Sequence, residues 1–271
     1  MIEHYNEHSL DTLCASLALA MGIEPPAQSA PSNLSLDEFV NAAFQGSRAD
    51  RIFMYNPDAI AQWIYEKYTY LLREVAAYAP HPLPLACVMP SCTPVCFGTM
   101  YTGAQPEVHG IRKYVKPVIT IDTLFDALIR NGKKVAIVAD KGSSMAHIYN
   151  EREIDYYYYD TLPEINAKAA ELIREDRHDF IAVYNANYDD IMHRYGPESA
   201  EALSELRVDS HAFAVFAELI KTYWGNHNTL LGFAMDHGCH EIDGGCGSHG
   251  LYMEEDINIL HFYGAYPAAN I

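Results

Sequence analysis

Histidine and carboxylate side chains gather in one glycine-rich stretch near the C-terminal end of the chain. This stretch, residues 235–250, contains Asp236, His237 and His249, and it directly follows an apolar run typical of a strand. Imidazole and carboxylate groups are ligands of zinc, manganese and iron, and glycines allow the backbone to fold tightly around an ion. Histidines in polar loops are equally often only solvated, so a metal site requires matching ligands elsewhere in the chain.

Two other segments carry residues that match. Asp189 and His193 are four residues apart, which is about one helical turn, so both side chains can reach one ion from the same helix face. Asp58 follows the first strand-like run of the main part of the chain. Each also has a purely structural interpretation, Asp189 as a helix-start carboxylate beside an exposed histidine and Asp58 as an N-cap after Pro57.

A candidate nucleophile, Thr93, lies in a segment rich in proline and cysteine. A threonine hydroxyl needs a base or a metal ion before it can attack at neutral pH. Thr93 is otherwise typical of a turn residue before Pro94. Cys92 and Cys96 flank it and compete for the same role, although the sequence offers neither an evident dedicated histidine base.

From Arg51 onward, short apolar runs alternate with amphipathic segments. The expected strands are 52–55, 86–89, 135–139, 156–159, 180–184, 229–235 and 257–263, and the expected helices are 59–77, 95–102, 121–131, 164–175 and 198–223. This alternation predicts an α/β fold with three α/β/α layers around a mostly parallel sheet. Ligands of such sheets bind beyond the carboxyl ends of the strands, where we expect Asp58, Thr93, Asp189 and Asp236 to converge.

Residues 1–50 are expected to form a helical extension packed on a catalytic domain of residues 51–271. One helix is expected at 10–21, capped by Ser9 and ended by Gly22, and another at 36–44, capped by Ser35. Acidic residues, rather than Lys or Arg, precede the apolar run 13–23. This run is therefore unlike a signal peptide, and it is too short to span a bilayer.

The composition limits the classes of partner. The chain has 271 residues, of which 49% are hydrophobic, and a formal net charge of −18. This charge disfavours a nucleic acid polymer or an anionic membrane as a partner, whereas bound divalent cations could attract a small anionic substrate. Six cysteines are too few for a disulfide scaffold at this length, so we expect reduced thiols and a cytoplasmic location. The number of subunits is left open.

Residues 90–111 resemble the nucleophile segment of the alkaline phosphatase superfamily, in particular its type I phosphodiesterase/nucleotide pyrophosphatase branch. There, a threonine precedes a Thr-Gly pair by nine residues, and a Pro-Glu-x-His-Gly-Ile signature follows. Thr93, Thr102 and the residues 106–111 fit that register. Residues 187–199 resemble the branch's Asp-x-x-x-His-x-x-Gly-Pro segment. Asp58, the Asp-His-Gly at 236–238 and the Ser-His-Gly at 248–250 match further motifs, so that the resemblance spans roughly 51–263.

The resemblance implies an alkaline-phosphatase-like core with two divalent metal ions, zinc being expected and manganese or iron being alternatives. The implied ligands are Asp189, His193 and His249 for one ion, and Asp58, Asp236, His237 and Thr93 for the other. It also implies hydrolysis of phosphodiester or nucleotide-like substrates through a covalent phosphothreonine. Hydrolysis of phosphomonoesters, phosphonates or sulfate esters, a phosphomutase reaction, and a non-catalytic metal-binding domain are the alternatives.

Three features bear on substrate binding. Cys96 stands where the branch usually carries an asparagine that donates to a phosphoryl oxygen, and a thiol is a poor donor. Arg112 and Lys113 form a small basic cluster that could meet the distal anion of a substrate, or could be a solvated loop. The short spacing between His193 and Asp236 leaves little room for a substrate-selecting cap domain.

Overall fold

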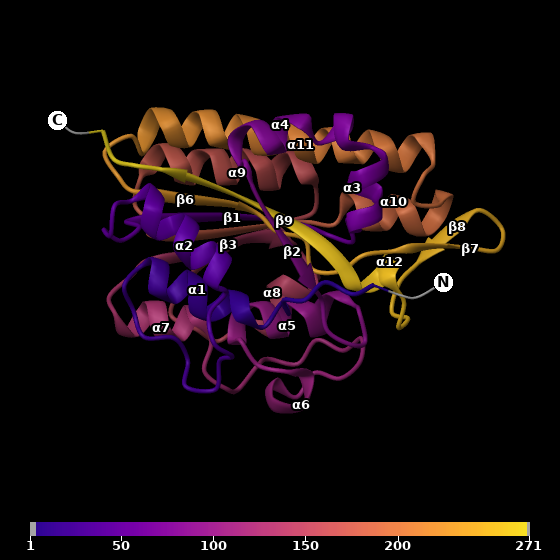
Figure 1. Ribbon diagram of the computed structural model, residues 1–271, viewed down its shortest axis with the longest axis horizontal. Coiled ribbons are helices and arrows are strands. Elements are labelled where there is room, and N and C mark those ends of the chain that lie inside the picture. Colours follow the sequence, from indigo (N-terminus) through magenta and orange to yellow (C-terminus); the bar gives the residue numbers. More distant parts are fainter. Residues whose placement is uncertain (1–3, 270–271) are drawn as a thin grey trace.

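The computed structural model describes residues 4–269 and is built around a seven-stranded sheet with the order β2-β9-β6-β1-β5-β3-β4 (Figure 1). Its strands are β1 (Arg51–Pro57), β2 (His81–Ala86), β3 (Val135–Asp140), β4 (Asp155–Tyr159), β5 (Phe180–Asn185), β6 (Thr229–Phe233) and β9 (Asn258–Tyr266). Strands β6, β1, β5, β3 and β4 run parallel, and β9 runs antiparallel to both β6 and β2. The prediction of a mostly parallel sheet is confirmed.

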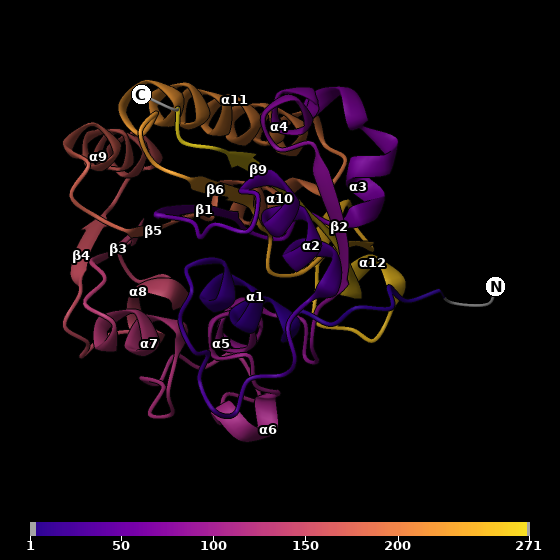
Figure 2. The same cartoon turned by 60° about the vertical axis from the view of Figure 1, so that its left-hand side comes forward.

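Helices cover both faces of the sheet, which confirms the three-layer α/β/α architecture (Figures 1 and 2). One layer contains α4 (Arg73–Tyr78), α9 (Leu162–Glu175) and α11 (Ala200–Tyr223); the other contains α1 (Thr12–Ala20), α2 (Leu34–Ala43), α5 (Thr93–Thr102), α7 (Leu124–Arg130) and α8 (Ser144–Ile148). The remaining helices are α3 (Gln62–Lys67), α6 (Pro106–His109), α10 (Asn187–Tyr195) and α12 (Glu254–Ile257).

The predicted helix 59–77 is wrong as a single element. Ala59 has a left-handed backbone with φ of 61°, and α3, a 3₁₀ turn at Thr69–Leu71 and α4 follow it in succession. The break after α3 has a local cause, because the Thr69 hydroxyl donates to the backbone carbonyls of Tyr65 (3.0 Å) and Glu66 (3.2 Å). Side chains that bond backbone carbonyls in this way compete with continued helix.

The predicted strand 86–89 is also misplaced, since the strand in this region, β2, ends at Ala86. Pro82 and Pro84 disfavour a strand at 81–86 in a sequence pattern, but β2 is an edge strand of the sheet, and β9 is its one neighbour among the named strands, with a single bridge from Ser9 to Ala86 besides. An edge strand tolerates proline because one side of its backbone needs no ladder partner. Residues 87–92 instead lead from the sheet edge to α5.

Helix starts differ from the predicted caps for reasons visible in the hydrogen bonds. Asn33, rather than Ser35, caps α2, and its side chain accepts from the backbone amides of Ser35 and Leu36. Helix α1 begins at Thr12 with Asp11 at its N-cap. Ser9 contributes its backbone carbonyl, which accepts from the amide and the hydroxyl of Thr12, rather than its side chain. Helix α7 begins at Leu124 behind a capping box formed by Thr123 and Asp126.

The N-terminal helices share the core of the sheet. Helix α1 packs against α5 and α7, and its buried residues include Leu13 and Leu17. The backbone of His8–Leu10 hydrogen-bonds to Ala86 at the end of β2. A domain boundary at residue 50 stays a prediction. In the part of the chain that the structure describes, every helix is too short or too polar to cross a membrane.

A buried carboxylate on α11 gives the fold a testable pH dependence. Asp209 accepts from Tyr55 Oη (2.7 Å) and Asn187 Nδ2 (3.3 Å), and burial raises its pKa to about 7. A raised pKa means that this carboxyl's contribution is fully present below its unfolded pKa and is lost as the pH rises through about 7.

We therefore expect the Asp209→Asn variant to gain stability relative to the wild type as the pH rises from 4 to 8. The gain should reach about 4 kcal/mol at most, at about 1.4 kcal/mol per unit of pKa shift. Urea unfolding of both proteins across this pH range measures it. A difference in unfolding free energy that stays constant with pH would contradict the expectation.

Candidate active site

Three neighbouring parallel strands place three aspartates at one edge of the sheet. Asp236 follows β6, Asp58 follows β1, and Asp189 lies in the first turn of α10, directly after β5. Backbone hydrogen bonds continue the strand ladder to this edge, from Ala234 N to Tyr55 O (2.8 Å) and from Asp58 N to Asn185 O (3.0 Å). The order of these strands in the sheet, β6-β1-β5, thus brings together carboxylates that lie far apart in the sequence.

The first cluster consists of Asp58, Asp236 and His237. One potential ligand atom of each residue lies within 4.8 Å of those of the others. His237 Nε2 is 3.3 Å from Asp58 Oδ1 and 3.4 Å from Asp236 Oδ2. All three side chains are buried, so their charges interact across a medium that screens poorly.

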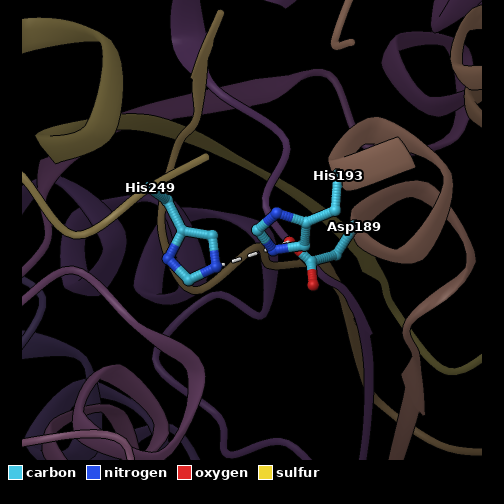
Figure 3. Close-up of side chains that lie close together, drawn as sticks. All are labelled: Asp189, His193 and His249. Carbon is cyan, nitrogen blue, oxygen red and sulfur yellow. Dashed lines mark ion pairs between the residues drawn. The ribbon is translucent and has the colours of Figure 1, made fainter. Parts of the chain in front are cut away.

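The second cluster consists of Asp189, His193 and His249, again with ligand atoms within 4.8 Å of one another. Figure 3 shows the His249 ring facing the side chains of Asp189 and His193, which come together from α10. The Nε2 atoms of His193 and His249 lie 3.3 Å and 3.6 Å from Asp189 Oδ1. The clusters adjoin, because the ring centroids of His237 and His249 are 4.1 Å apart.

Backbone carbonyls orient the imidazoles. The Nδ1 atoms of His237 and His249 lie 2.9 Å from Gly238 O and 2.8 Å from Ser91 O. A carbonyl only accepts, so each Nδ1 carries a proton, and Nε2 is the ring atom that faces the carboxylates and could bind a cation lying between them. Burial, and to a lesser extent the neighbouring His237 ring, lowers the pKa of His249 to about 3, which keeps the His249 ring neutral. Neutral imidazole is the form that ligates metals.

Within the described residues, three buried carboxylate oxygens have no hydrogen-bond partner: Asp58 Oδ1, Asp189 Oδ1 and Asp236 Oδ2. Burial and the charges of Asp236 and Asp189 raise the pKa of Asp58 well above its ordinary value, and burial raises the pKa of Asp236 to about 7. Buried carboxylates without donors are costly. Cations at the two clusters would compensate all three oxygens, so these residues fit divalent metal ions.

The second cluster has a different electrostatic balance. Burial alone raises the pKa of Asp189, but the close polar contact with His193 and the nearby imidazoles lower it below its ordinary value overall. The same contact raises the pKa of His193 to about 9. Binding of a cation by His193 must therefore displace a proton from its ring.

Thr93 stands at the first position of α5, beside the first cluster. Its hydroxyl Oγ1 lies 3.3 Å from Asp58 Oδ2 and 3.4 Å from His237 Nε2. The structure also distinguishes Thr93 from its cysteine competitors. Burial raises the pKa of Cys92 to about 12 and the pKa of Cys96 well above its ordinary value, so both remain thiols, which are much weaker nucleophiles than thiolates.

Tyr184 is a site residue that sequence reasoning missed. It is buried near the end of β5, and its hydroxyl donates to Asp58 Oδ2, the same oxygen that faces Thr93. In the sequence it only ends the apolar run 180–184, and nothing in that pattern distinguishes it from the other strand residues. A donor on a ligating carboxylate typically fixes the orientation of that carboxylate.

The predicted substrate-contact residues lie in different surroundings. Cys96 is fully buried, and its thiol is 3.8 Å from Val88 O, so the side chain is closed to solvent. Arg112 and Lys113 are exposed on the loop after α6, and Arg112 donates to Glu107 O (3.3 Å). The structure does not join these three residues to the clusters of aspartate and histidine that it describes, and their role in substrate binding stays a prediction.

Tyr114 lies on the same loop and is 60% exposed. Partial burial, together with the charges of Asp58 and Asp189, raises its pKa. The Lys116 ammonium lies 5.4 Å from the centroid of its ring. Tyr114 is thus an exposed aromatic residue beside Arg112 and Lys113 in the chain.

The glycine-rich stretch is more ordered than a loop. Strands β7 (His240–Ile242) and β8 (Cys246–Ser248) form a hairpin whose turn contains Gly244 and Gly245, both with positive φ. Gly247 O accepts from His193 Nδ1 at 3.0 Å, so the hairpin buttresses α10. The two ends of the stretch then reach the two clusters separately, through His237 and His249.

Comparisons with known proteins agree with this geometry. A sequence profile of the type I phosphodiesterase / nucleotide pyrophosphatase family matches residues 55–263, a range that includes Asp58, Thr93, Asp189, Asp236 and His249. No curated protein sequence matches the chain significantly.

Solved structures share the fold. Murine ectonucleotide pyrophosphatase / phosphodiesterase 5 matches with a TM-score of 0.55 and 17% identity, over 72% of this chain and 58% of that one. The zinc complex of the C-terminal periplasmic domain of EptC from Escherichia coli matches with a TM-score of 0.55 and 13% identity, over 81% of this chain and 74% of that one.

Phosphonoacetate hydrolase from Sinorhizobium meliloti, in complex with phosphonoformate, matches with a TM-score of 0.52 and 19% identity, over 75% of this chain and 61% of that one. The chain thus spans less than two thirds of the length of the murine protein and of the hydrolase. Identities this low show the fold alone. The solved structures show that the chain has an alkaline-phosphatase-like fold. Because the family profile matches most of its length, the chain belongs to the type I phosphodiesterase/nucleotide pyrophosphatase family.

Proposed function

We propose that this protein is a two-metal-ion hydrolase of phosphate esters that acts on phosphodiester or nucleotide-like substrates. The observation that carries the proposal is the position of the Thr93 hydroxyl, within 3.4 Å of both Asp58 and His237 of the first cluster, which itself adjoins the second cluster of metal-binding type. Family membership supports the same reaction class.

The two clusters would each hold one divalent ion. The proposed ligands are Asp58, Asp236, His237 and Thr93 for one ion, and Asp189, His193 and His249 for the other. Sets of carboxylate and imidazole suit zinc, with manganese and iron as alternatives. When bound, two such ions supply positive charge to the attacking and leaving oxygens of an in-line displacement.

Thr93 would act as the nucleophile. Its hydroxyl proton lies along the hydrogen bond to Asp58 Oδ2, which leaves a lone pair of Oγ1 free to attack phosphorus. The new bond from Oγ1 to phosphorus forms as the bond to the leaving oxygen breaks, the hydroxyl proton departs along the bond to Asp58, and the leaving oxygen takes up a proton to become an alcohol, giving a phosphothreonine that keeps the second ester group. Water then attacks the same phosphorus and breaks its bond to Oγ1, which releases the monoester product and restores the hydroxyl.

Two observations favour a nucleotide-like substrate. Tyr114 is an exposed aromatic residue whose pKa the charges of Asp58 and Asp189 help to raise, and aromatic rings stack well on bases. A structure of the murine relative in an inactive form is a complex with AMP. The strongly acidic chain would rely on the bound ions to attract such an anion.

A panel of p-nitrophenyl substrates tests the proposal. We expect the zinc-loaded protein to hydrolyse bis(p-nitrophenyl) phosphate and the p-nitrophenyl ester of thymidine 5′-monophosphate faster than p-nitrophenyl phosphate, a phosphonate or p-nitrophenyl sulfate. Manganese and iron(II) are added in parallel assays, and a chelator should abolish turnover. Preference for the monoester, phosphonate or sulfate would reassign the substrate class. Turnover of no substrate with any metal would instead indicate a non-catalytic metal-binding domain.

A further inference from the structure

One buried carboxylate outside the two clusters contacts both ends of the segment that connects them. Asp256, on the short helix α12, has no exposed surface. Its Oδ1 is 2.7 Å from His240 Nδ1, and its Oδ2 accepts from the backbone amide of Leu251 at 2.8 Å. Its backbone carbonyl accepts from Gly238 N, also at 2.8 Å. A single residue thus closes the loop formed by residues 238–251.

The first end of this loop fits tightly against α12. A Cβ atom added at Gly238 would lie 2.1 Å from Glu255 O, so only glycine permits this approach. Gly238 directly follows Asp236 and His237, the residues of the first cluster. The contact with Asp256 therefore fixes the point at which the chain leaves that cluster.

The second end of the loop carries His249 of the second cluster. His249 Nδ1 is held by Ser91 O (2.8 Å), and Gly250 N donates to Ser91 Oγ (3.1 Å). Leu251, the next residue, donates to Asp256 Oδ2. The chain around His249 is consequently held at two points. Ser91, in the loop before α5, binds the imidazole and the amide of Gly250, and Asp256 binds the amide of Leu251.

Asp256 is itself well anchored. Helix α12 leads directly into β9, which pairs with both β6 and β2 in the central sheet. Cys87 also binds this point of the chain, because its thiol lies 3.3 Å from Asp256 O and its amide donates to Ile257 O at 2.8 Å. Because α12 is fixed to the sheet in this way, the Asp256 carboxylate holds His240 and Leu251 at a fixed position relative to the sheet.

We propose that Asp256 is a positioning residue that sets the distance between His249 and Asp189 and so keeps the second metal site at its place beside the first. The inference rests on the proposed two-metal function. It extends that function to a residue outside the ligand set, because Asp256 binds the chain on both sides of the β7–β8 hairpin, at Gly238 and His240 on one side and at Leu251 on the other. Loss of the bond to Leu251 would remove one of the contacts that fix the chain next to His249, the others being those with Ser91.

The Asp256→Asn variant tests the role. An asparagine keeps the size of the side chain but has only one oxygen, whereas His240 and Leu251 meet different oxygens of Asp256, so one of the two positions loses its acceptor. We expect one of the two bound zinc ions to be held about 10–100-fold more weakly, in line with the usual cost of changing a group that orients a ligand. The affinity of the other ion should change less than about threefold. Competition with a chromophoric chelator measures both dissociation constants, and hydrogen exchange at the Leu251 amide should become faster.

Two further variants complete the test. Glu255→Gln alters the neighbouring carboxylate of the same helix and should leave both zinc affinities unchanged. His240→Ala removes one contact of Asp256 and keeps its bond to Leu251, and it should weaken one ion by a smaller factor, about tenfold or less. This second variant reports on the role of Asp256 even where Asp256→Asn lowers the yield of folded protein.

The outcomes separate the two proposals. If the wild type binds two ions and Asp256→Asn binds them equally well, the positioning role is overturned and the proposed function stands. Equal weakening of both ions together with a large fall in the thermal midpoint would show that Asp256 only supports the fold. A wild-type protein that binds no ion would overturn the proposed function and, with it, the positioning role.

Discussion

Replacing Thr93 with alanine is expected to lower kcat for phosphodiester hydrolysis by at least about a thousandfold, because the change removes the oxygen that attacks phosphorus. Metal content should stay nearly unchanged, since Asp58, Asp236 and His237 keep their positions around the first ion. Steady-state kinetics with bis(p-nitrophenyl) phosphate and metal analysis of the purified variant measure the two quantities on one sample.

Two matched variants sharpen this prediction. Thr93→Ser keeps a hydroxyl at the first position of α5 and should retain activity within about a hundredfold. Thr93→Val keeps the branched shape but lacks the oxygen, and it should be as inactive as alanine. Phosphoryl transfer that persists in Thr93→Val would place the nucleophile elsewhere, and Cys92 would then be the next residue to change.

The second large effect is expected for His249→Ala. This change removes one imidazole from the cluster with Asp189 and His193 and leaves Asp189 Oδ1 with one fewer partner. We expect the purified protein to lose about one of its two zinc ions and to lose at least about a hundredfold in kcat, because removal of a ligand costs more than the 10–100-fold typical of a residue that orients one.

A matched control is His211→Ala, which removes an exposed histidine on α11. Its metal content and kcat should equal those of the wild type. A His249→Ala variant with unchanged zinc stoichiometry and affinity would remove His249 from the proposed ligand set. Loss of both ions in that variant would indicate that the two clusters bind cooperatively rather than as separate sites.

Local pattern was enough to predict the architecture. Apolar runs such as 180–184 are buried on both faces of a parallel sheet, and this burial leaves a continuous hydrophobic signal. The four-residue spacing of Asp189 and His193 likewise indicated a shared helix face, and both lie on α10. Such features depend on neighbours within one or two turns of chain, so the sequence carries them directly.

Elements decided by distant contacts were the ones predicted incorrectly. Strand β2 contains Pro82 and Pro84 and is a strand because β9 pairs with it from a point far along the chain. The break between α3 and α4 is the exception, because its cause is local: the Thr69 hydroxyl bonds the backbone of the preceding turn. The glycine-rich stretch forms a hairpin, because contacts with α10 and α12 order it at both ends.

The sequence by itself determined which residue types are available for the site and at which strand ends they stand. Only the tertiary structure decided how they group. The order β6-β1-β5 in the sheet sets Asp236, Asp58 and Asp189 side by side, and the loop between His237 and His249 lets these two histidines join different clusters. The tertiary structure also showed the roles of Tyr184 and Asp256. The role of a buried hydroxyl or carboxylate depends on the partner that it contacts across the fold, and such partners lie too far away in the chain for a local sequence pattern to indicate them.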